Sequence, residues 1–198
     1  MTHALIVIDV QNDFCPGGAL EVPQGDEILR SVNALMPEFD AVVLTQDWHP
    51  AGHSSFASSH DGNAPYEIVT MPYGPQVLWP DHCIQGSIGA QFHPELQTDR
   101  ADLIIRKGYN PDIDSYSAFF ENDHRTPTGL EGYLRTRGIE RLTMVGLALD
   151  FCVNFSAVDA AKLGFKVDVR EDLCRAIDLD GSLAKAREGM RAAGVTLA

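Results

Sequence analysis

The sequence contains few cysteines, and no two of them lie close together. Cys15, Cys83, Cys152 and Cys174 are spread along the chain without a C-x-x-C spacing. This excludes a zinc knuckle and a dithiol redox motif, because both need closely spaced thiols. Each cysteine is therefore judged alone, and packing is the ordinary role of a buried thiol. We assign that role to Cys15, Cys83 and Cys174.

Basic residues are also scarce. The chain has 15 Lys and Arg against 28 Asp and Glu, which gives a formal net charge of −13. Such a charge repels the phosphate backbone of nucleic acids and the anionic headgroups of membranes. We therefore expect neither nucleic acid nor a membrane as a partner, and a small molecule as the ligand. The sequence leaves open whether the protein forms a homo-oligomer.

Long hydrophobic runs are absent. The first apolar run has no basic residue before it and is interrupted at Asp9. It is too short for a secretory signal or a membrane span, so we expect a cytoplasmic protein. The chain has 198 residues, of which 44% are hydrophobic. This size predicts one domain over residues 1–198.

Short apolar, β-branched runs alternate with helical patterns. The runs cover residues 4–8, 41–45, 103–105, 142–145 and 165–169. The spacing of apolar residues predicts helices over 25–38, 128–137 (with Thr128 as the N-cap), 150–163 and 181–193. Apolar strands that alternate with helices favour a parallel sheet buried on both faces. The predicted class is α/β, a three-layer doubly wound (Rossmann-like), mostly parallel β-sheet with helices on both faces.

Residues 48–98 do not follow this alternation. They are rich in Pro, Gly, Ser and His and show little periodicity. A connection of this length is uncommon in a compact domain unless it is functional. We therefore expect a long loop at about 48–98 that contributes to a metal or substrate site.

Chemically versatile side chains follow the predicted strands. They are Asp9, Asp47 with His49, Lys107 and Cys152. Taken singly, each has an ordinary explanation as a cap, a solvated side chain or a core residue. In open parallel sheets, however, ligands bind beyond the carboxyl ends of the strands. A carboxylate, an ammonium and a thiol brought to the same edge predict a catalytic site.

Cys152 is the expected nucleophile. It stands at the start of the predicted helix 150–163, where the helix dipole and the Lys107 cation are expected to lower the thiol pKa. Asp9 is the expected general acid and base. The backbone N–H groups of Ala148 and Cys152 are expected to hold a developing oxyanion.

A carboxylate and two imidazoles predict a metal site. Asp47 and His49 are two apart on an extended segment, so they point to the same side, and His82 is expected to join them from the long loop. Three ligands with open positions suit one divalent ion, Zn, Fe or Mn. The alternative is that these are loop histidines with ordinary hydrogen bonds. His53 is either a further ligand or a surface histidine.

Aromatic residues lie near these groups in the sequence. They are Phe14, Trp79, Tyr116 and Phe119. Aromatic side chains either form the wall of a pocket for a ring-shaped ligand or pack in the core.

Five motifs, in order, resemble the bacterial nicotinamidases (pyrazinamidases) of the isochorismatase-like cysteine hydrolase family. They are DVQNDFCPGGAL (9–20), TQDWHPAGHSSFASSH (45–60), WPDHCIQGSIGAQFH (79–93), RKGYNPDIDSYSAFF (106–120) and GLALDFCV (146–153). The resemblance extends from Leu5 to about Gly194. It implies hydrolysis of nicotinamide to nicotinate and ammonia through a cysteine thioester, and of pyrazinamide to pyrazinoic acid, in NAD salvage.

The resemblance also implies roles for individual residues. It implies the triad Asp9, Lys107 and Cys152, the metal ligands Asp47, His49 and His82, and ring contacts from Phe14, Trp79 and Tyr116. It further implies that the metal binds the ring nitrogen and that the peptide bond between Leu147 and Ala148 is cis. Two positions depart from the family pattern. His53 does not match the further ligand of some members, and Leu149 replaces a common threonine.

Three other functions remain open. The ligand set Asp47, His49 and His82 also fits a facial-triad iron oxygenase, which would have no use for Cys152 or Lys107. A protein that binds the metabolite without catalysis is the second alternative. An amidase for other small carboxamides or ureas is the third.

Overall fold

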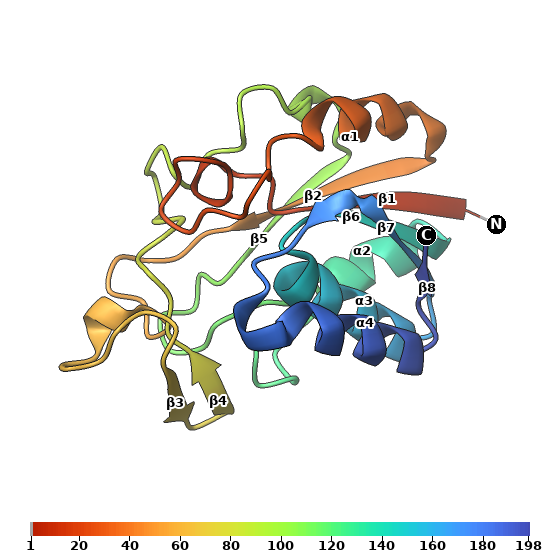
Figure 1. Ribbon diagram of the computed structural model, residues 1–198. Helices are drawn as coiled ribbons and strands as arrows, with labels where there is room; N and C mark the ends of the chain where they lie inside the picture. Colours follow the sequence, from red (N-terminus) through yellow and green to blue (C-terminus); the bar gives the residue numbers. More distant parts are fainter. Residues whose placement is uncertain (1) are drawn as a thin grey trace.

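The centre of the molecule is a parallel β-sheet. The computed structural model describes residues 2–198, and its main sheet has six strands in the order β5-β2-β1-β6-β7-β8 (Figure 1). The strands are β1 (Thr2–Ile8), β2 (Ala41–Asp47), β5 (Leu103–Lys107), β6 (Ile139–Leu147), β7 (Lys166–Arg175) and β8 (Thr196–Leu197). Every pair of neighbouring strands is parallel. The prediction of a parallel sheet is confirmed, and β8 is an addition to it.

Helices cover both faces of this sheet. Figure 1 shows α1 (Leu29–Leu35) on one face and α2 (Leu130–Thr136), α3 (Asn154–Lys162) and α4 (Ser182–Ala192) on the other. The doubly wound α/β class is therefore confirmed. Within residues 2–198, no helix has the length and apolar character needed to cross a membrane.

The central strand β1 explains why both faces are covered. Leu5 and Val7 pack in the cluster that contains Val32 of α1, whereas Ile6 and Ile8 pack in the cluster on the opposite face. Successive side chains of a strand point to opposite faces, so an unbroken apolar run needs an apolar partner on each side. The run at residues 4–8 thus fixes the three-layer arrangement.

Two helices differ from their predicted extents. Residues 24–28 form turns, so α1 begins at Leu29, and Met36–Glu38 form a 3-10 turn in which Pro37 has no N–H to continue the α-helix. The predicted helix 150–163 is divided into a π-helix, Leu149–Val153, and α3.

The predicted cap of the second helix is also displaced by one residue. Gly129, with φ 101°, occupies the position directly before α2. The Thr128 hydroxyl nevertheless accepts the N–H of Leu130, at 3.2 Å. Thr128 therefore satisfies one free N–H of the first turn, as an N-cap side chain does, from a position further back in the chain.

The long loop lies beyond the carboxyl ends of the strands (Figure 1). It contains a two-stranded antiparallel hairpin, β3 (Ile68–Met71) and β4 (Gly74–Val77), which the sequence did not predict. Isolated bridges connect His49 with Ile84 and Phe56 with Trp79. These bridges bring the two ends of the loop to the same edge of the sheet as the residues that follow β1, β2 and β5.

Candidate active site

Four adjacent strands deliver four reactive side chains to one edge of the sheet. Lys107 ends β5, Asp47 ends β2, Asp9 follows β1, and Cys152 lies one turn after β6. Because β5, β2, β1 and β6 are neighbours in that order, the four residues form a row. Asp47 and Lys107 are also paired directly in the strand register. The structure thus brings together the residues that the sequence placed at strand ends.

Lys107 contacts each of the other three residues of this row. Its Nζ lies 2.6 Å from Oδ1 of Asp47 and 2.9 Å from Oδ2 of Asp9. It also donates to Sγ of Cys152 at 3.5 Å and to the carbonyl oxygen of Ser115 at 2.8 Å. Burial alone would lower the lysine pKa, but the carboxylates of Asp47 and Asp9 raise it well above its usual value. Lys107 is therefore a buried cation, with only 1% of its surface exposed.

Asp9 is fully buried, with 0% of its surface exposed. Its backbone is left-handed, with φ 47°. Oδ1 accepts a 2.5 Å hydrogen bond from the Thr45 hydroxyl, whereas Oδ2 faces Lys107. Burial raises the pKa of Asp9 overall, although Lys107 opposes this effect. A raised pKa means that this carboxyl group holds a proton more readily than a free one, which suits a group that must take up a proton and release it during catalysis.

Cys152 lies in the π-helix Leu149–Val153 and is 7% exposed. Burial raises its thiol pKa well above the usual value, and Lys107 only partly opposes this effect. Our expectation of a lowered pKa is therefore wrong, because desolvation of the thiolate outweighs the nearby cation. Atoms of Asp9, Asp47 and Cys152 lie within 4.8 Å of one another. A side-chain hydrogen bond with Asp9 also contributes to the raised thiol pKa, so the Asp9 carboxylate is placed to take the thiol proton when the sulfur attacks.

Ala148 and Cys152 line the same cavity. The peptide bond between Leu147 and Ala148 is cis, as the resemblance implied. The backbone of Ala148 is extended, and the π-helix with Cys152 starts at the next residue. The two residues whose N–H groups are expected to hold an oxyanion therefore both line the cavity.

The cavity is open to solvent on one side, and about 330 Å³ of empty space, open solvent included, lies between its walls. The predicted ring contacts Phe14, Trp79 and Tyr116 all line it, together with Leu20, Asp114, Phe151 and Ile177. Phe119 does not; it packs in the core with its ring centroid 6.1 Å from that of Phe165. Phe151 could not be predicted as a wall residue, because an aromatic residue beside the nucleophile is equally consistent with a place in the core.

The aromatic walls are held by polar contacts and edge-to-face packing. The indole N–H of Trp79 and the side-chain N–H of Gln76 both donate to the Tyr116 hydroxyl, at 3.0 and 2.8 Å. The ring centroids of Trp79 and Phe151 lie 4.9 Å apart and nearly perpendicular. Such pairs fix the orientation of each ring. The result is a pocket of aromatic side chains that suits a flat ring.

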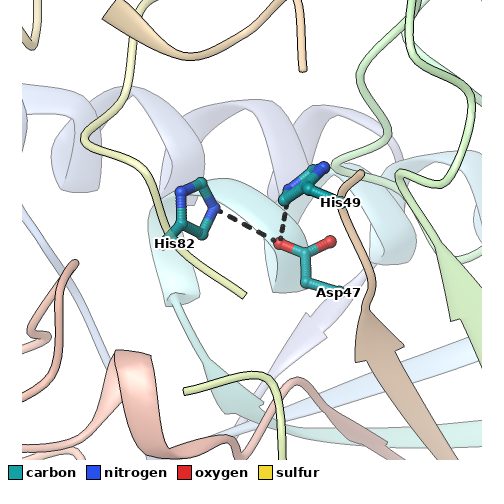
Figure 2. A group of neighbouring side chains, drawn as sticks. All are labelled: Asp47, His49 and His82. Atoms are coloured by element: carbon teal, nitrogen blue, oxygen red, sulfur yellow. Dashed lines mark ion pairs between the residues drawn. The ribbon is translucent and has the colours of Figure 1, made fainter. Parts of the chain in front are cut away.

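Asp47, His49 and His82 converge beside this cavity (Figure 2). The Nδ1 atoms of His49 and His82 donate to the carbonyl oxygens of Gly108 and Pro80, each at 2.8 Å. Because a carbonyl only accepts, Nδ1 carries the hydrogen, and each Nε2 has a free lone pair when the ring is neutral. Both Nε2 atoms face Oδ2 of Asp47, at 3.5 and 3.7 Å. Acceptors that face one another in this way fit a divalent cation.

His53 is a neighbour of this group rather than part of it. Its Nε2 is 2.7 Å from the carbonyl oxygen of Asn110, and its Nδ1 accepts the N–H of Ser55 at 3.1 Å. Both ring nitrogens are therefore engaged in hydrogen bonds. His53 is buried, so the expectation of a surface histidine is wrong.

Polar residues that the sequence analysis missed hold these groups in place. Gln11 donates to the carbonyl oxygen of Asp47 at 2.9 Å and accepts its N–H at 2.8 Å. Asp13 accepts the N–H of Cys83, next to His82, at 2.7 Å. Both belong to the motif at 9–20, and their spacing alone carries no sign of what they contact. Gln11 thus holds the backbone of Asp47, and Asp13 holds the backbone next to His82.

Known proteins resemble this chain over nearly its full length. A nicotinamidase of Acinetobacter baylyi is 54% identical over 192 residues, which cover 97% of this chain and 90% of that protein. A solved nicotinamidase/pyrazinamidase of Acinetobacter baumannii superposes with a TM-score of 0.98 at 55% identity, covering 99% of this chain and 95% of the other. A pyrazinamidase of Pyrococcus horikoshii in complex with zinc gives a TM-score of 0.79 at 35% identity, covering 100% and 99%.

The family assignment rests on the same extent of sequence. A profile of the isochorismatase domain matches residues 3–198. The relatives above share the fold, and the matches cover most of the length of each relative. The resemblance seen in the sequence motifs is thus confirmed, and the chain belongs to the isochorismatase family.

Proposed function

We propose that this protein is an amidohydrolase that converts nicotinamide to nicotinate and ammonia, and that it also accepts pyrazinamide. One observation carries the proposal: Asp9 and Lys107 lie behind Cys152, which lines a cavity with aromatic walls next to a three-ligand metal site. The nicotinamidase of A. baylyi, at 54% identity, supports the same reaction.

Cys152 attacks the carboxamide carbon. Its thiol is protonated at rest because burial raises its pKa, so the proton passes to Asp9 as the carbon–sulfur bond forms. Lys107 lies 3.5 Å from the sulfur and stabilises the negative charge during the transfer. The N–H groups of Ala148 and Cys152 hold the oxyanion, and one such donor contributes about 3 kcal/mol to transition-state stabilisation.

Asp9 then returns the proton to the leaving nitrogen. The tetrahedral intermediate collapses, the carbon–nitrogen bond breaks, and ammonia departs, which leaves a thioester on Cys152. Asp9 next takes a proton from water, whose oxygen attacks the thioester, and gives that proton to the departing sulfur. Nicotinate is released, and the thiol and the carboxylate return to their starting states.

The ring is held by the aromatic pocket and the metal site. Phe14, Trp79 and Tyr116 pack against the faces and edges of the pyridine. A divalent ion held by Asp47, His49 and His82, which we propose to be zinc, iron or manganese, supplies an electrophilic position for the ring nitrogen. The zinc complex of the P. horikoshii relative supports a divalent ion. Fixing the amide near the sulfur contributes part of the roughly 7–11 kcal/mol available from positioning.

We place this activity in NAD salvage in the cytoplasm. The acidic composition, with a net charge of −13, supports a small-molecule substrate and argues against nucleic acid or a membrane as a partner. The formation of a homo-oligomer is a separate question, which size-exclusion chromatography answers.

The test is ammonia release from nicotinamide by the purified, metal-loaded protein. We expect turnover that is lost in Cys152→Ala and reduced by a chelator. A facial-triad oxygenase would keep its activity in Cys152→Ala, and a metabolite-binding protein would bind nicotinamide without releasing ammonia. A panel of small carboxamides and ureas separates nicotinamide from the substrates of related amidases. Full deamidation by Cys152→Ala would overturn the proposal.

A further inference from the structure

Thr45 makes two hydrogen bonds to the same neighbouring residue. It lies in β2, two positions before the end of the strand, and is fully buried. Its Oγ1 accepts the backbone N–H of Asp9 at 3.1 Å and donates to Oδ1 of the same residue at 2.5 Å. Thr45 does not line the cavity. Both hydrogen bonds of its hydroxyl therefore act on Asp9, and none acts on the cavity wall.

The direction of these bonds is fixed by the chemistry of a hydroxyl. A threonine hydroxyl has one hydrogen and two acceptor sites. Because the N–H of Asp9 can only donate, it occupies an acceptor site of Oγ1. The single hydrogen is then directed to Oδ1 of Asp9, since that oxygen lies at 2.5 Å. Oδ1 is thus held as an acceptor.

The second carboxylate oxygen is left without a hydrogen bond of good geometry among residues 2–198. Oδ2 lies 2.9 Å from Nζ of Lys107, and the same nitrogen is 3.5 Å from the sulfur of Cys152. Oδ2 therefore faces the reacting groups, whereas Oδ1 faces the strand. The Lys107 cation compensates the charge of Oδ2, and this oxygen remains the one that can accept a proton from the reacting groups.

We propose that Thr45 is a positioning residue that assigns the mobile catalytic proton to Oδ2 of Asp9. With Oδ1 occupied by the hydroxyl, the proton leaves the thiol, binds Oδ2 and passes from Oδ2 to the leaving nitrogen. In the second half of the reaction, Oδ2 takes a proton from water and returns it to the sulfur. The inference rests on the proposed function, because it assigns an atom to the acid–base step of that reaction.

Replacement of the hydroxyl by a methyl group tests this role. Thr45→Val keeps the shape of the side chain but frees Oδ1, so that the proton can bind on the side away from the sulfur. We expect kcat for nicotinamide to fall about 10- to 100-fold, as for loss of a hydrogen bond to a charged group. We expect KM to stay within about threefold, because Thr45 makes no ring contact. Thr45→Ser restores the hydroxyl, and kcat should return to within about threefold of wild type.

A matched control is available on a neighbouring part of the sheet. Thr143 in β6 is also buried, and its hydroxyl pairs with Nε2 of His3 at 2.9 Å, far along the strand from the site. We expect Thr143→Val to keep kcat within about twofold. Metal content and melting temperature are measured for every variant. If Thr45→Val does not fold, Thr45→Ala is compared with Thr45→Ser, and the same loss of kcat is expected.

Three results would overturn the inference. The first is a wild-type kcat in Thr45→Val or Thr45→Ala. The second is a Thr45→Ser enzyme as impaired as Thr45→Val, which would make the methyl group rather than the hydroxyl responsible. The third is an effect on KM or metal content alone. Failure of the proposed function is distinct from all three, since the wild-type protein itself would then release no ammonia.

Discussion

Lys107 donates a 2.6 Å hydrogen bond to Oδ1 of Asp47, the carboxylate whose other oxygen faces the two histidines of the proposed metal site. Burial alone would raise the pKa of Asp47, but Lys107 and His49 hold it well below its usual value. The same ammonium contacts Asp9. One cation therefore keeps Asp47 ionised for a metal and balances the acid–base carboxylate, so the two halves of the site depend on each other.

Replacement of Lys107 by methionine should destabilise the fold as well as abolish activity. The variant leaves the buried carboxylates of Asp9 and Asp47 facing each other without a cation, and removal of one partner from a buried ion pair costs about 3–5 kcal/mol. The free energy of unfolding from urea titration checks this. Lys162→Met is the control, because that side chain is 67% exposed and its ion pair with Asp159 spans 3.8 Å. We expect a change within about 0.5 kcal/mol there. Equal stability of both variants would contradict the prediction.

Substitutions of the three histidines should differ in their effect on metal content. His49→Ala and His82→Ala remove a free Nε2 lone pair and should lose most of the bound metal, whereas His53→Gln should retain it, because both nitrogens of His53 are engaged by Asn110 and Ser55. Elemental analysis of each purified protein, before and after dialysis against a chelator, measures the metal content. Wild-type protein treated in the same way should lose ammonia release and regain it on addition of Zn²⁺. Loss of the metal from His53→Gln would make His53 a ligand.

The sheet and its helical layers could be predicted from the sequence because local signals and tertiary packing agree there. The run at 4–8 is apolar on both sides, and only a sheet covered on both faces buries it. The hairpin at Ile68–Met71 and Gly74–Val77 could not be predicted, because Ile68 is exposed, and apolar and polar residues do not alternate along the two strands. The π-helix at Leu149–Val153 was read as α-helix because one additional residue per turn leaves no clear trace in the pattern.

The strand-end rule located the row of reactive groups but not the residues that orient them. Asp9, Lys107 and Cys152 were found because parallel strands end at one edge. Thr45 and Gln11 were missed, since a single polar residue inside an apolar strand or after it has no spacing to identify its partner. The raised pKa of Cys152 was also missed, because burial is a property of the folded chain and the sequence showed only the neighbouring cation.

The histidine in β1 should make stability depend on pH. Burial and the nearby Arg141 lower the pKa of His3 below 6.5. The unfolded chain therefore binds a proton more readily than the folded one, so the contribution of His3 to stability is complete above pH 6.5 and is lost as the pH falls through 6.5 towards the folded-state pKa. His3→Gln should flatten the decline in unfolding free energy between about pH 7.5 and about pH 5.5. An unchanged slope in urea titrations would disprove this assignment.

Asp150 connects the π-helix that contains Cys152 to the segment that contains Ile177. Its buried carboxylate accepts the N–H groups of Ile177 and Asp178 at 3.1 and 2.8 Å and the hydroxyl of Ser182 at 2.5 Å. Ile177 lines the cavity together with Phe151, which is adjacent to Asp150 in the chain. One carboxylate thus sets the position of two residues on the cavity wall.

Asp150→Asn should therefore weaken both the fold and substrate binding. The amide offers one acceptor oxygen and turns an N–H₂ group towards donors, so we expect a loss of about 1–3 kcal/mol in unfolding free energy. KM for nicotinamide should rise by a larger factor than kcat falls, because Ile177 lies on the cavity wall and not at the reacting atoms. Asp172→Asn, at a side chain that is 56% exposed, is the control and should change neither quantity appreciably. If Asp150→Asn lowers stability and leaves KM unchanged, the carboxylate supports the turn but does not place Ile177.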